Sequence, residues 1–164
     1  METRMDFHLL SRSYTVKRLD KVDVDAAFEL MSKNTVFYQY HPPFVTKESI
    51  IKDMEALPPQ KSDEDKYYVG FFENQTLIAV MDLILAYPDE ETAFIGFFMT
   101  DVRYQRKGIG SKMIREVCAC LKASGCKKVR LGVDKGNPQS YAFWVKNQFR
   151  VIEEGAYLLM EFVL

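Results

Sequence analysis

The segment from Leu77 to Leu85 constrains the fold most, because apolar side chains occupy both alternating faces of a run that has the length of one strand. Strands that are apolar on both faces belong in the middle of a sheet that other elements cover on both sides. Asp82 is the only charged residue in this run. The chain has 164 residues, which suits one domain, and 48% of them are hydrophobic, which is enough to fill a core. The sequence therefore predicts one domain, residues 1–164, with a covered central sheet.

Hydrophobic spacing predicts strands over residues 13–19, 67–72, 76–87, 92–102 and 128–133, and two more strands end the chain. Helices are expected over residues 23–34, 47–57 and 109–124, and another begins at Pro138. Thr46 is the expected N-cap of the second helix. Residues 35–45, which are rich in aromatics and contain two prolines, are expected to form a loop, and residues 1–12 a poorly ordered extension. This order of elements predicts an α/β fold around a mixed sheet.

Charge and composition exclude several classes of partner. The 22 Lys plus Arg residues against 23 Asp plus Glu residues give a formal net charge of −1, so nucleic acid is not an expected partner. The longest uninterrupted apolar run, Leu77 to Met81, is too short to cross a membrane, and the N-terminus lacks the apolar core of a signal peptide. Cys118, Cys120 and Cys126 have no metal-ligand spacing and are interpreted as reduced thiols. We therefore expect a cytoplasmic protein without a metal.

The segment Gln105 to Ser111, with sequence QRKGIGS, carries the clearest functional signal. It lies between a predicted strand and a predicted helix, where unpaired backbone N–H groups and the helix dipole favour an anion. Gly108 and Gly110 allow a phosphate to approach the backbone closely, and Arg106 and Lys107 add positive charge. The spacing matches neither the P-loop nor the Rossmann fingerprint. The alternative is a glycine-rich helix start that binds nothing.

A resemblance favours the functional interpretation. Gln105 to Gly110 resembles the Q/R-x-x-G-x-G/A motif of the GNAT superfamily of N-acetyltransferases, and Asn137 to Phe149 resembles the family's second signature, N-x-x-A/S-x-x-F-Y-x-K-x-G-F. The order of elements from Tyr14 to Leu164 agrees with the resemblance. It implies a mixed, mostly antiparallel sheet of about six to seven strands with splayed central strands, flanked by about four helices.

The resemblance also implies acetyl-CoA, or another short acyl-CoA, as the acyl donor. The amides of Gln105, Arg106, Lys107, Gly108, Ile109, Gly110 and Ser111 would hold the pyrophosphate. The backbone of Phe98, Met99 and Thr100 would pair with the pantetheine arm, and an N–H near Met99 would stabilise the oxyanion. Asn137 and Ser140 match the family's polar contacts to the cofactor. The alternatives are an N-cap for Asn137 and a helix-surface residue for Ser140, and for Asn137 both roles can hold at once.

The proton donor for the leaving thiolate departs from the family pattern. The family tyrosine is replaced by Trp144, whose indole N–H cannot act as a general acid, and Gln148 replaces the following glycine. Tyr141 and Tyr157 are the candidate substitutes, and packing is the alternative role for each. Asp82 either forms a buried pair with a Lys or Arg, or faces the acceptor cleft, where it would hold the substrate ammonium group or relay its proton through water.

The acceptor is the least defined part of the sequence. Tyr38, His41 and Asp82 are the candidate acceptor-binding residues, and a structural role in a loop is the alternative for His41. The leading hypothesis is direct acetyl transfer to a primary amine of a small molecule, without a covalent enzyme intermediate. The alternatives are acetylation of a protein N-terminus or lysine, and a non-catalytic module that senses acyl-CoA. A homodimer is left open.

Overall fold

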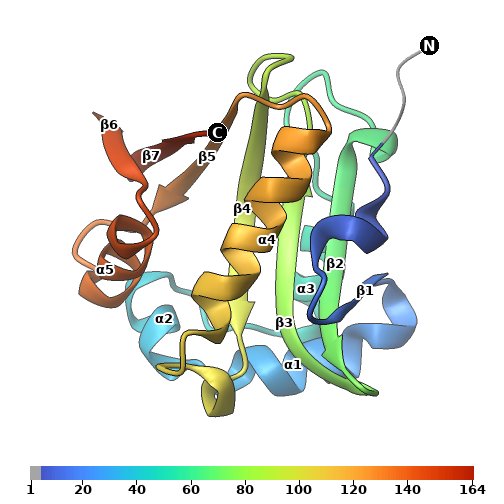
Figure 1. The fold of residues 1–164 in the computed structure, drawn as a ribbon. Coiled ribbons are helices and arrows are strands. Elements are labelled where there is room, and N and C mark those ends of the chain that lie inside the picture. Colours follow the sequence, from blue (N-terminus) through green and yellow to red (C-terminus); the bar gives the residue numbers. More distant parts are fainter. Residues whose placement is uncertain (1–4) are drawn as a thin grey trace.

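The computed structural model describes residues 5–164 and contains a seven-stranded sheet with helices on both faces (Figure 1). The strands are β1 (Thr15–Arg18), β2 (Lys66–Glu73), β3 (Thr76–Ile84), β4 (Thr92–Thr100), β5 (Lys128–Val133), β6 (Arg150–Glu154) and β7 (Leu158–Val163). The helices are α1 (Val24–Ser32), α2 (Thr35–Tyr40), α3 (Lys47–Glu55), α4 (Ile109–Ala123) and α5 (Pro138–Lys146). The described residues thus form five α-helices, one more than expected.

The strand order is β1-β2-β3-β4-β5-β7-β6, and β4 and β5 are the parallel neighbours in an otherwise antiparallel sheet. This confirms the expected mixed, mostly antiparallel fold. β3 lies inside the sheet between β2 and β4, as its two apolar faces predict. Met81 packs in a core cluster with Met113 and Val117 of α4, and Val80 packs on the other face with Leu30 of α1.

The sheet opens between β4 and β5. Their pairing runs from Thr92 and Lys128 to Ile95 and Leu131 and stops there. The second half of β4 continues along β3 as far as Thr100. Gly96 lies at the irregular step, because Asp82 pairs with Phe97 and the next residue of β3, Leu83, pairs with Ile95. The expected splaying of the central strands is present at this point.

Several local predictions are confirmed. Thr46 caps α3 by accepting a hydrogen bond from the Ser49 N–H, and Pro138 occupies the first turn of α5. β3 and β4 end earlier than predicted, at Ile84 and Thr100, and a 3-10 turn, Val102–Tyr104, follows β4.

The prediction of a loop over residues 35–45 is wrong for its first half, which forms α2. The two prolines, Pro42 and Pro43, lie beyond the last helical residue and so do not interrupt it. Phe37 in α2 packs edge-on against Phe97 of β4, with ring centroids 5.8 Å apart. This tertiary contact anchors a helix whose sequence shows no amphipathic repeat.

The expectation of a poorly ordered extension is wrong for residues 5–12, and residues 1–4 lie outside the described residues. Phe7–Leu10 form a 3-10 turn that is capped by Asp6, and the Leu10 side chain is fully buried. Glu116 of α4 accepts hydrogen bonds from the hydroxyls of Ser11 and Ser13, both at 2.8 Å. The segment is therefore fastened to α4.

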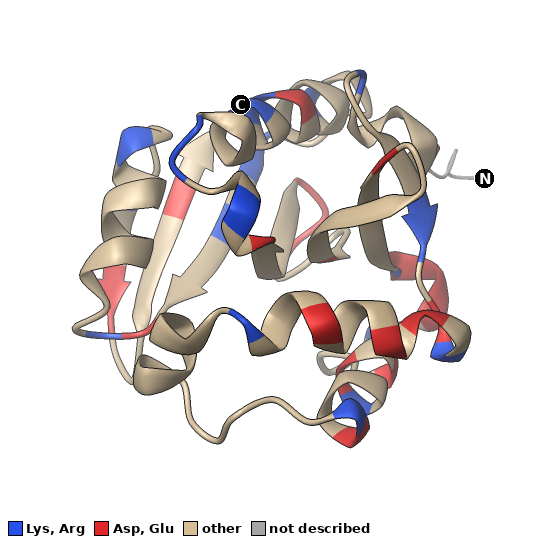
Figure 2. Cartoon of the chain, turned by 90° about the horizontal axis from the view of Figure 1, so that it is seen from below, with Lys and Arg blue, Asp and Glu red and all other residues tan. Residues whose placement is uncertain are grey.

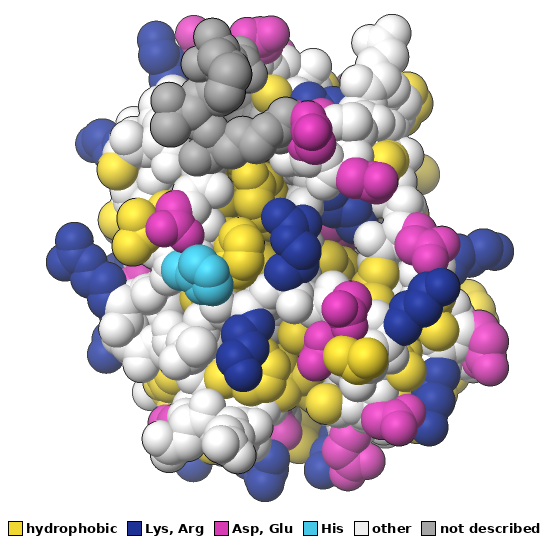
Figure 3. Space-filling model, turned by 90° about the vertical axis from the view of Figure 1, so that its right-hand side faces the viewer, with side chains coloured by type: hydrophobic (Ala, Val, Ile, Leu, Met, Phe, Trp, Pro, Cys, Tyr) yellow, Lys and Arg dark blue, Asp and Glu magenta, His cyan; other side chains and the backbone are white. Residues whose placement is uncertain are grey.

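Across residues 5–164, no helix is long and apolar enough to span a membrane. Figure 3 shows the side of the molecule that carries β1, where Lys and Arg side chains alternate with Asp and Glu. This face carries no large patch of a single charge.

Candidate active site

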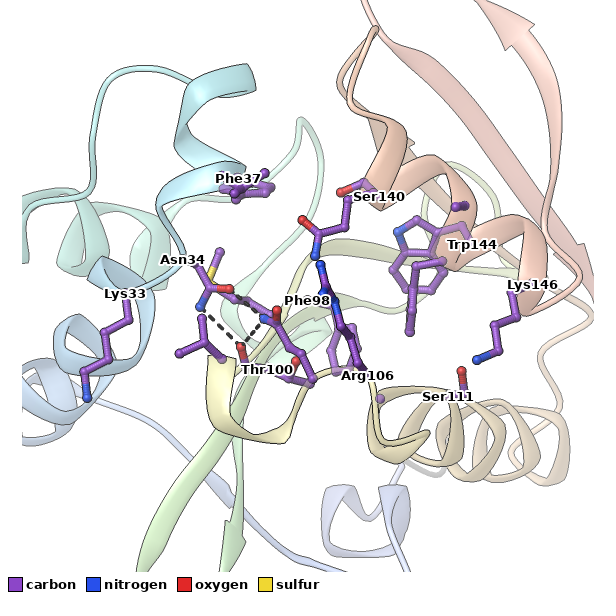
Figure 4. Close-up of a pocket in the computed structure, with 18 of the residues that line it drawn as sticks. Lys33, Asn34, Phe37, Phe98, Thr100, Arg106, Ser111, Ser140, Trp144 and Lys146 are labelled. Atoms are coloured by element: carbon purple, nitrogen blue, oxygen red, sulfur yellow. Dashed lines mark hydrogen bonds between the residues drawn. The ribbon is translucent and has the colours of Figure 1, made fainter.

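A cavity of about 650 Å³ lies at the opening of the sheet (Figure 4). Its wall combines the segment between α1 and α2, the end of β4, the start of α4 and one face of α5. Among its lining residues are three cations, Lys33, Arg106 and Lys146, and no acidic residue. Figure 2 shows α2 without any charged residue. The cavity is therefore suited to a ligand that carries negative charge at its α4 end.

The start of α4 has the backbone of an anion site. Gly108 precedes the helix with a left-handed φ of 79°, and Arg106 has a φ of 63°. The Lys112 N–H donates to the Gly108 carbonyl at 3.0 Å, which is the first hydrogen bond of the helix. The N–H groups of the first turn come before this bond and therefore have no acceptor within the helix. Gly108, Gly110 and Ser111 line the cavity with Arg106. These groups fit a pyrophosphate.

The two glycines of the motif serve different purposes. A Cβ at Gly108 would meet nothing within 4 Å, so its left-handed backbone explains this glycine. A Cβ at Gly110 would lie 3.2 Å from Phe143 Cε1 and 3.6 Å from Thr100 Cγ2. Gly110 therefore allows α4, β4 and α5 to approach one another at the cavity.

Lys107 and Ile109, the other predicted contributors, do not line the cavity with their side chains; Lys107 is exposed and Ile109 packs against the main core. Only their backbone groups belong to the candidate anion site.

The backbone of β4 alternates between its two neighbours. The Asp101 N–H donates to the Ile78 carbonyl of the β3 segment at 2.8 Å, and in an antiparallel pair every second residue bonds to the same neighbour. The backbone N–H and carbonyl of Met99 therefore point towards β3. The backbone groups of Phe98 and Thr100 point towards the gap beside β5. The backbone groups available at the gap near Met99 are thus those of its two neighbours.

The Thr100 carbonyl is already bonded, which the sequence did not indicate. Asn34 Nδ2 donates to it at 3.2 Å and Gln105 Nε2 at 3.0 Å, and Gln105 also donates to Asn34 Oδ1 at 2.7 Å. Dashed lines mark bonds of this network in Figure 4. The N–H and carbonyl of Phe98 and the N–H of Thr100 also face the gap, beyond the last β4–β5 pair among the described residues. Asn34 carries no recognisable signal in a single sequence, because its partners come from distant segments.

The predicted polar residues of α5 have separate positions. Asn137 is buried and caps α5, since its Oδ1 accepts from the Ser140 N–H at 3.1 Å. Ser140 lines the cavity. Asn147, at the other end of the helix, donates to Ser111 Oγ at 3.1 Å and joins α5 to α4.

Trp144 belongs to an aromatic cluster between α5 and β4. Its ring lies 6.1 Å from Phe98 and 4.9 Å from Phe143, and only 8% of its surface is exposed. Phe98, Phe143 and Trp144 all line the cavity. The position of the family tyrosine thus forms an apolar wall here.

The two candidate acids lie in different places. Neither lines the cavity: Tyr141 is 43% exposed on α5, and Tyr157 is 48% exposed. Tyr157 precedes β7, and its ring covers Gly132 of β5, where a Cβ would lie 2.7 Å from Tyr157 Cδ2. Gly132 lies just beyond the last residue of β5 that pairs with β4. Tyr157 therefore stands beside the opening of the sheet.

Asp82 is paired with Lys66 of β2, which is the structural alternative drawn from the sequence. Lys66 Nζ donates to Oδ2 at 3.0 Å and lies 3.0 Å from Oδ1, although Oδ1 is buried and lacks a well-oriented hydrogen bond among the described residues. Burial raises the pKa of Asp82, and the Lys66 ammonium group offsets this only in part. Oδ2 lies 3.1 Å from the position that a Cβ of Gly96 would occupy. The carboxylate therefore packs over the backbone of Gly96 in β4.

The predicted acceptor residues of α2 lie on the same face of the sheet as α1 and α3. Burial and the charge of Asp53 raise the pKa of Tyr38 to about 12, and its ring packs 5.2 Å from Phe44. The His41 Nδ1 lies 3.0 Å from both oxygens of Asp134, which follows β5. This contact connects α2 to the β5 side of the opening.

Comparisons with known proteins agree with this architecture. The family model for the acetyltransferase (GNAT) family matches residues 28–149. No curated protein matches the sequence. Among solved structures, an acetyltransferase from Thermus thermophilus has a TM-score of 0.77 at 20% identity, with 96% of this chain and 98% of that chain covered.

PaiA N-acetyltransferase from Thermoplasma acidophilum in complex with coenzyme A has a TM-score of 0.71 at 21% identity, covering 93% of this chain and 99% of that one. The ribosomal-protein-S18-alanine N-acetyltransferase from Escherichia coli has a TM-score of 0.65 at 16% identity, covering 91% and 92%. The chain belongs to the GNAT family and is an acyl-CoA-dependent N-acetyltransferase whose donor is acetyl-CoA.

Proposed function

We propose that this enzyme transfers the acetyl group of acetyl-CoA to the primary amine of a small molecule by direct attack. The bound donor supplies a thioester carbonyl whose oxygen gains negative charge as the amine attacks. The Phe98 N–H faces the gap and is suited to stabilise that charge. The amides at the start of α4 hold the pyrophosphate, with Arg106 beside them.

The His41–Asp134 contact is the observation that favours a small acceptor. It connects α2 to the β5 side of the opening and so limits the space for a polypeptide on the α2 face of the sheet. The rings of Phe37, Tyr38 and Phe97 lie on this face and supply apolar contacts. Asp134 and Asp82 supply negative charge for an ammonium group.

We further propose that Asp82 accepts the amine's proton through water and that Tyr157 protonates the leaving thiolate. Asp82 covers Gly96 at the bulge of β4, next to Phe97. Tyr157 covers Gly132, where β5 has left β4. Tyr157 is favoured over Tyr141 because its ring packs on Gly132 at the β4–β5 opening, whereas Tyr141 lies on the exposed surface of α5.

The test is release of CoA thiol from acetyl-CoA with a panel of probes: benzylamine, tyramine, spermidine, a peptide with a free N-terminus and an N-blocked lysine peptide. Turnover with the small amines that clearly exceeds that with both peptides is expected. Preferential turnover of a peptide would support the protein-acetylating alternative. Tight acetyl-CoA binding without thiol release for any probe would favour the sensor alternative.

We also propose a reducing, cytoplasmic compartment, because the three cysteines are free thiols and burial raises the pKa of each. A cell fractionation with a tagged chain tests this location.

A further inference from the structure

We infer that Asn34 is a positioning residue that couples cofactor binding at the Gln105–Ser111 loop to the placement of α2 over the acceptor side. This inference rests on the proposed function, because it assigns α2 to the acceptor. Asn34 lies between the end of α1 and the start of α2. Its side chain connects this break to the end of β4 and to the first residue of the cofactor loop.

The side chain of Asn34 does not cap α2, although Asn is a favoured residue at this N-cap position. As the residue before α2 it could cap the helix, yet it makes no capping bond. Its Nδ2 donates to the Leu30 carbonyl at 3.1 Å and the Thr100 carbonyl at 3.2 Å, and its Oδ1 accepts from Gln105. Only 8% of the residue is exposed. A buried amide with three partners in three segments fixes their relative positions.

The network stands at the boundary between the two halves of the cavity. Asn34, Thr100 and Gln105 all line it. Beyond Asn34 the wall continues into α2 with Phe37, and beyond Gln105 it continues into Arg106 and the start of α4. A ligand that fixes the loop at Gln105 therefore also fixes Asn34, and through it the first residue of α2. By thermodynamic reciprocity, an ordered α2 then favours the cofactor-binding form of the loop.

Hydrogen exchange with acetyl-CoA as the probe tests this coupling without a known acceptor. The reporter is residues 38–41, which belong to α2 and its end but do not line the cavity. In the parent protein, saturating acetyl-CoA is expected to slow exchange there by about fivefold or more. In Asn34→Ala this effect is lost, while acetyl-CoA still slows exchange over residues 109–115.

A second variant guards against a folding defect in the first. Gln105→Ala removes the bond to Asn34 from the loop side and is expected to have the same effect. Gln39→Ala, which removes an exposed amide from α2 outside the network, is the matched control and should keep the protection.

Three outcomes overturn the coupling: protection of residues 38–41 that persists in both network variants, its absence in a parent that does bind acetyl-CoA, or its loss in Gln39→Ala as well. If the parent protein does not bind acetyl-CoA at all, the proposed function itself fails, and this result is visible in the exchange of residues 109–115.

Discussion

Gly110 is the residue at which one added side chain should change cofactor binding most. Gly110→Val places atoms against Phe143 and Thr100 and beside the amides of the first turn of α4. We expect acetyl-CoA affinity to fall by about tenfold or more, because the added atoms displace Phe143, Thr100 or the first turn of α4, whose amides would hold the pyrophosphate. Titration calorimetry measures the change. Gly155→Val is the control, because a Cβ there meets nothing within 4 Å. Unchanged affinity in Gly110→Val would disprove the anion site.

Tyr157 and Tyr141 form a natural pair for testing the missing acid. If Tyr157 protonates the thiolate, Tyr157→Phe lowers kcat by roughly 10²-fold or more and changes acetyl-CoA affinity little, because only the leaving-group step loses its donor. Tyr141→Phe, on the exposed surface of α5, is the matched comparison and is expected to keep near-parental turnover under this assignment. The opposite pattern would assign the acid to Tyr141. Parental turnover in both variants would assign the proton donor to solvent.

Asp82 needs a test that separates chemistry from stability, because its partner is buried. Asp82→Asn leaves the Lys66 ammonium group, which is 5% exposed, without a counter-charge, so we expect a loss of about 3 kcal/mol in unfolding free energy. Lys66→Met combined with Asp82→Asn removes both charges and should recover most of the melting temperature. A catalytic Asp82 then predicts that the double variant stays inactive towards amines while it still binds acetyl-CoA. Recovered activity would assign Asp82 to the core.

Among the elements, those with strong periodic signals were predicted and those held by tertiary contacts were not. The apolar faces of β3, the long stripe of α4 and the Thr46 cap are local features, and each was found near its predicted place. α2 escaped prediction because its anchoring contact, Phe37 on Phe97, joins residues 60 positions apart. The same holds for the site. The loop before α4 is predicted by its local motif, whereas Asn34 acquires its partners, which are distant in sequence, only through folding.

The hydrogen bonds from Ser11 and Ser13 to Glu116 join the N-terminal segment to α4. We expect their contribution to stability to depend on pH. Burial acts to raise the pKa of Glu116, but hydrogen bonds from Ser11, Ser13 and the backbone outweigh it and hold this pKa below its ordinary value. A lowered folded-state pKa stabilises the fold above the unfolded value near 4.3, and this contribution is lost as pH falls through the folded value. Glu116→Gln should therefore lower unfolding free energy by about 1 kcal/mol at pH 7.

The difference in melting temperature between the parent and Glu116→Gln should shrink as the pH is lowered from about 5 to 3. Glu153→Gln, at an exposed position of β6, is the control and should match the parent throughout. A difference in melting temperature that stays constant with pH would show that the charge of Glu116 does not contribute to stability.

At the scale of the whole molecule, the sheet consists of two parts that are joined, among the described residues, by four β4–β5 pairs. Strands β1 to β4 form one part, β5 to β7 the other, and pairing ends at Ile95 and Leu131. The half of β4 beyond Ile95 leaves backbone groups of Phe98 facing the gap. A ligand that binds along this edge contacts both parts, because the cavity wall includes β4 on one side and α5 on the other. Its binding free energy therefore adds to the stability of the whole fold rather than of one part.

Acetyl-CoA at 100 times its dissociation constant should stabilise the fold by about 2.7 kcal/mol, because it binds the folded state alone. For a chain of this size that corresponds to a rise in melting temperature of roughly 5–10 °C, measurable by scanning calorimetry as one cooperative transition. Adenosine 3′-phosphate 5′-diphosphate, which keeps the pyrophosphate and lacks the pantetheine arm, should give a smaller rise at the same concentration. An equal rise with both ligands would show that the β4 edge takes no part in binding, and a two-step transition would show that the two parts of the sheet unfold separately. A single transition that shifts more with the complete donor is the result expected when the arm lies in the gap where the parts meet.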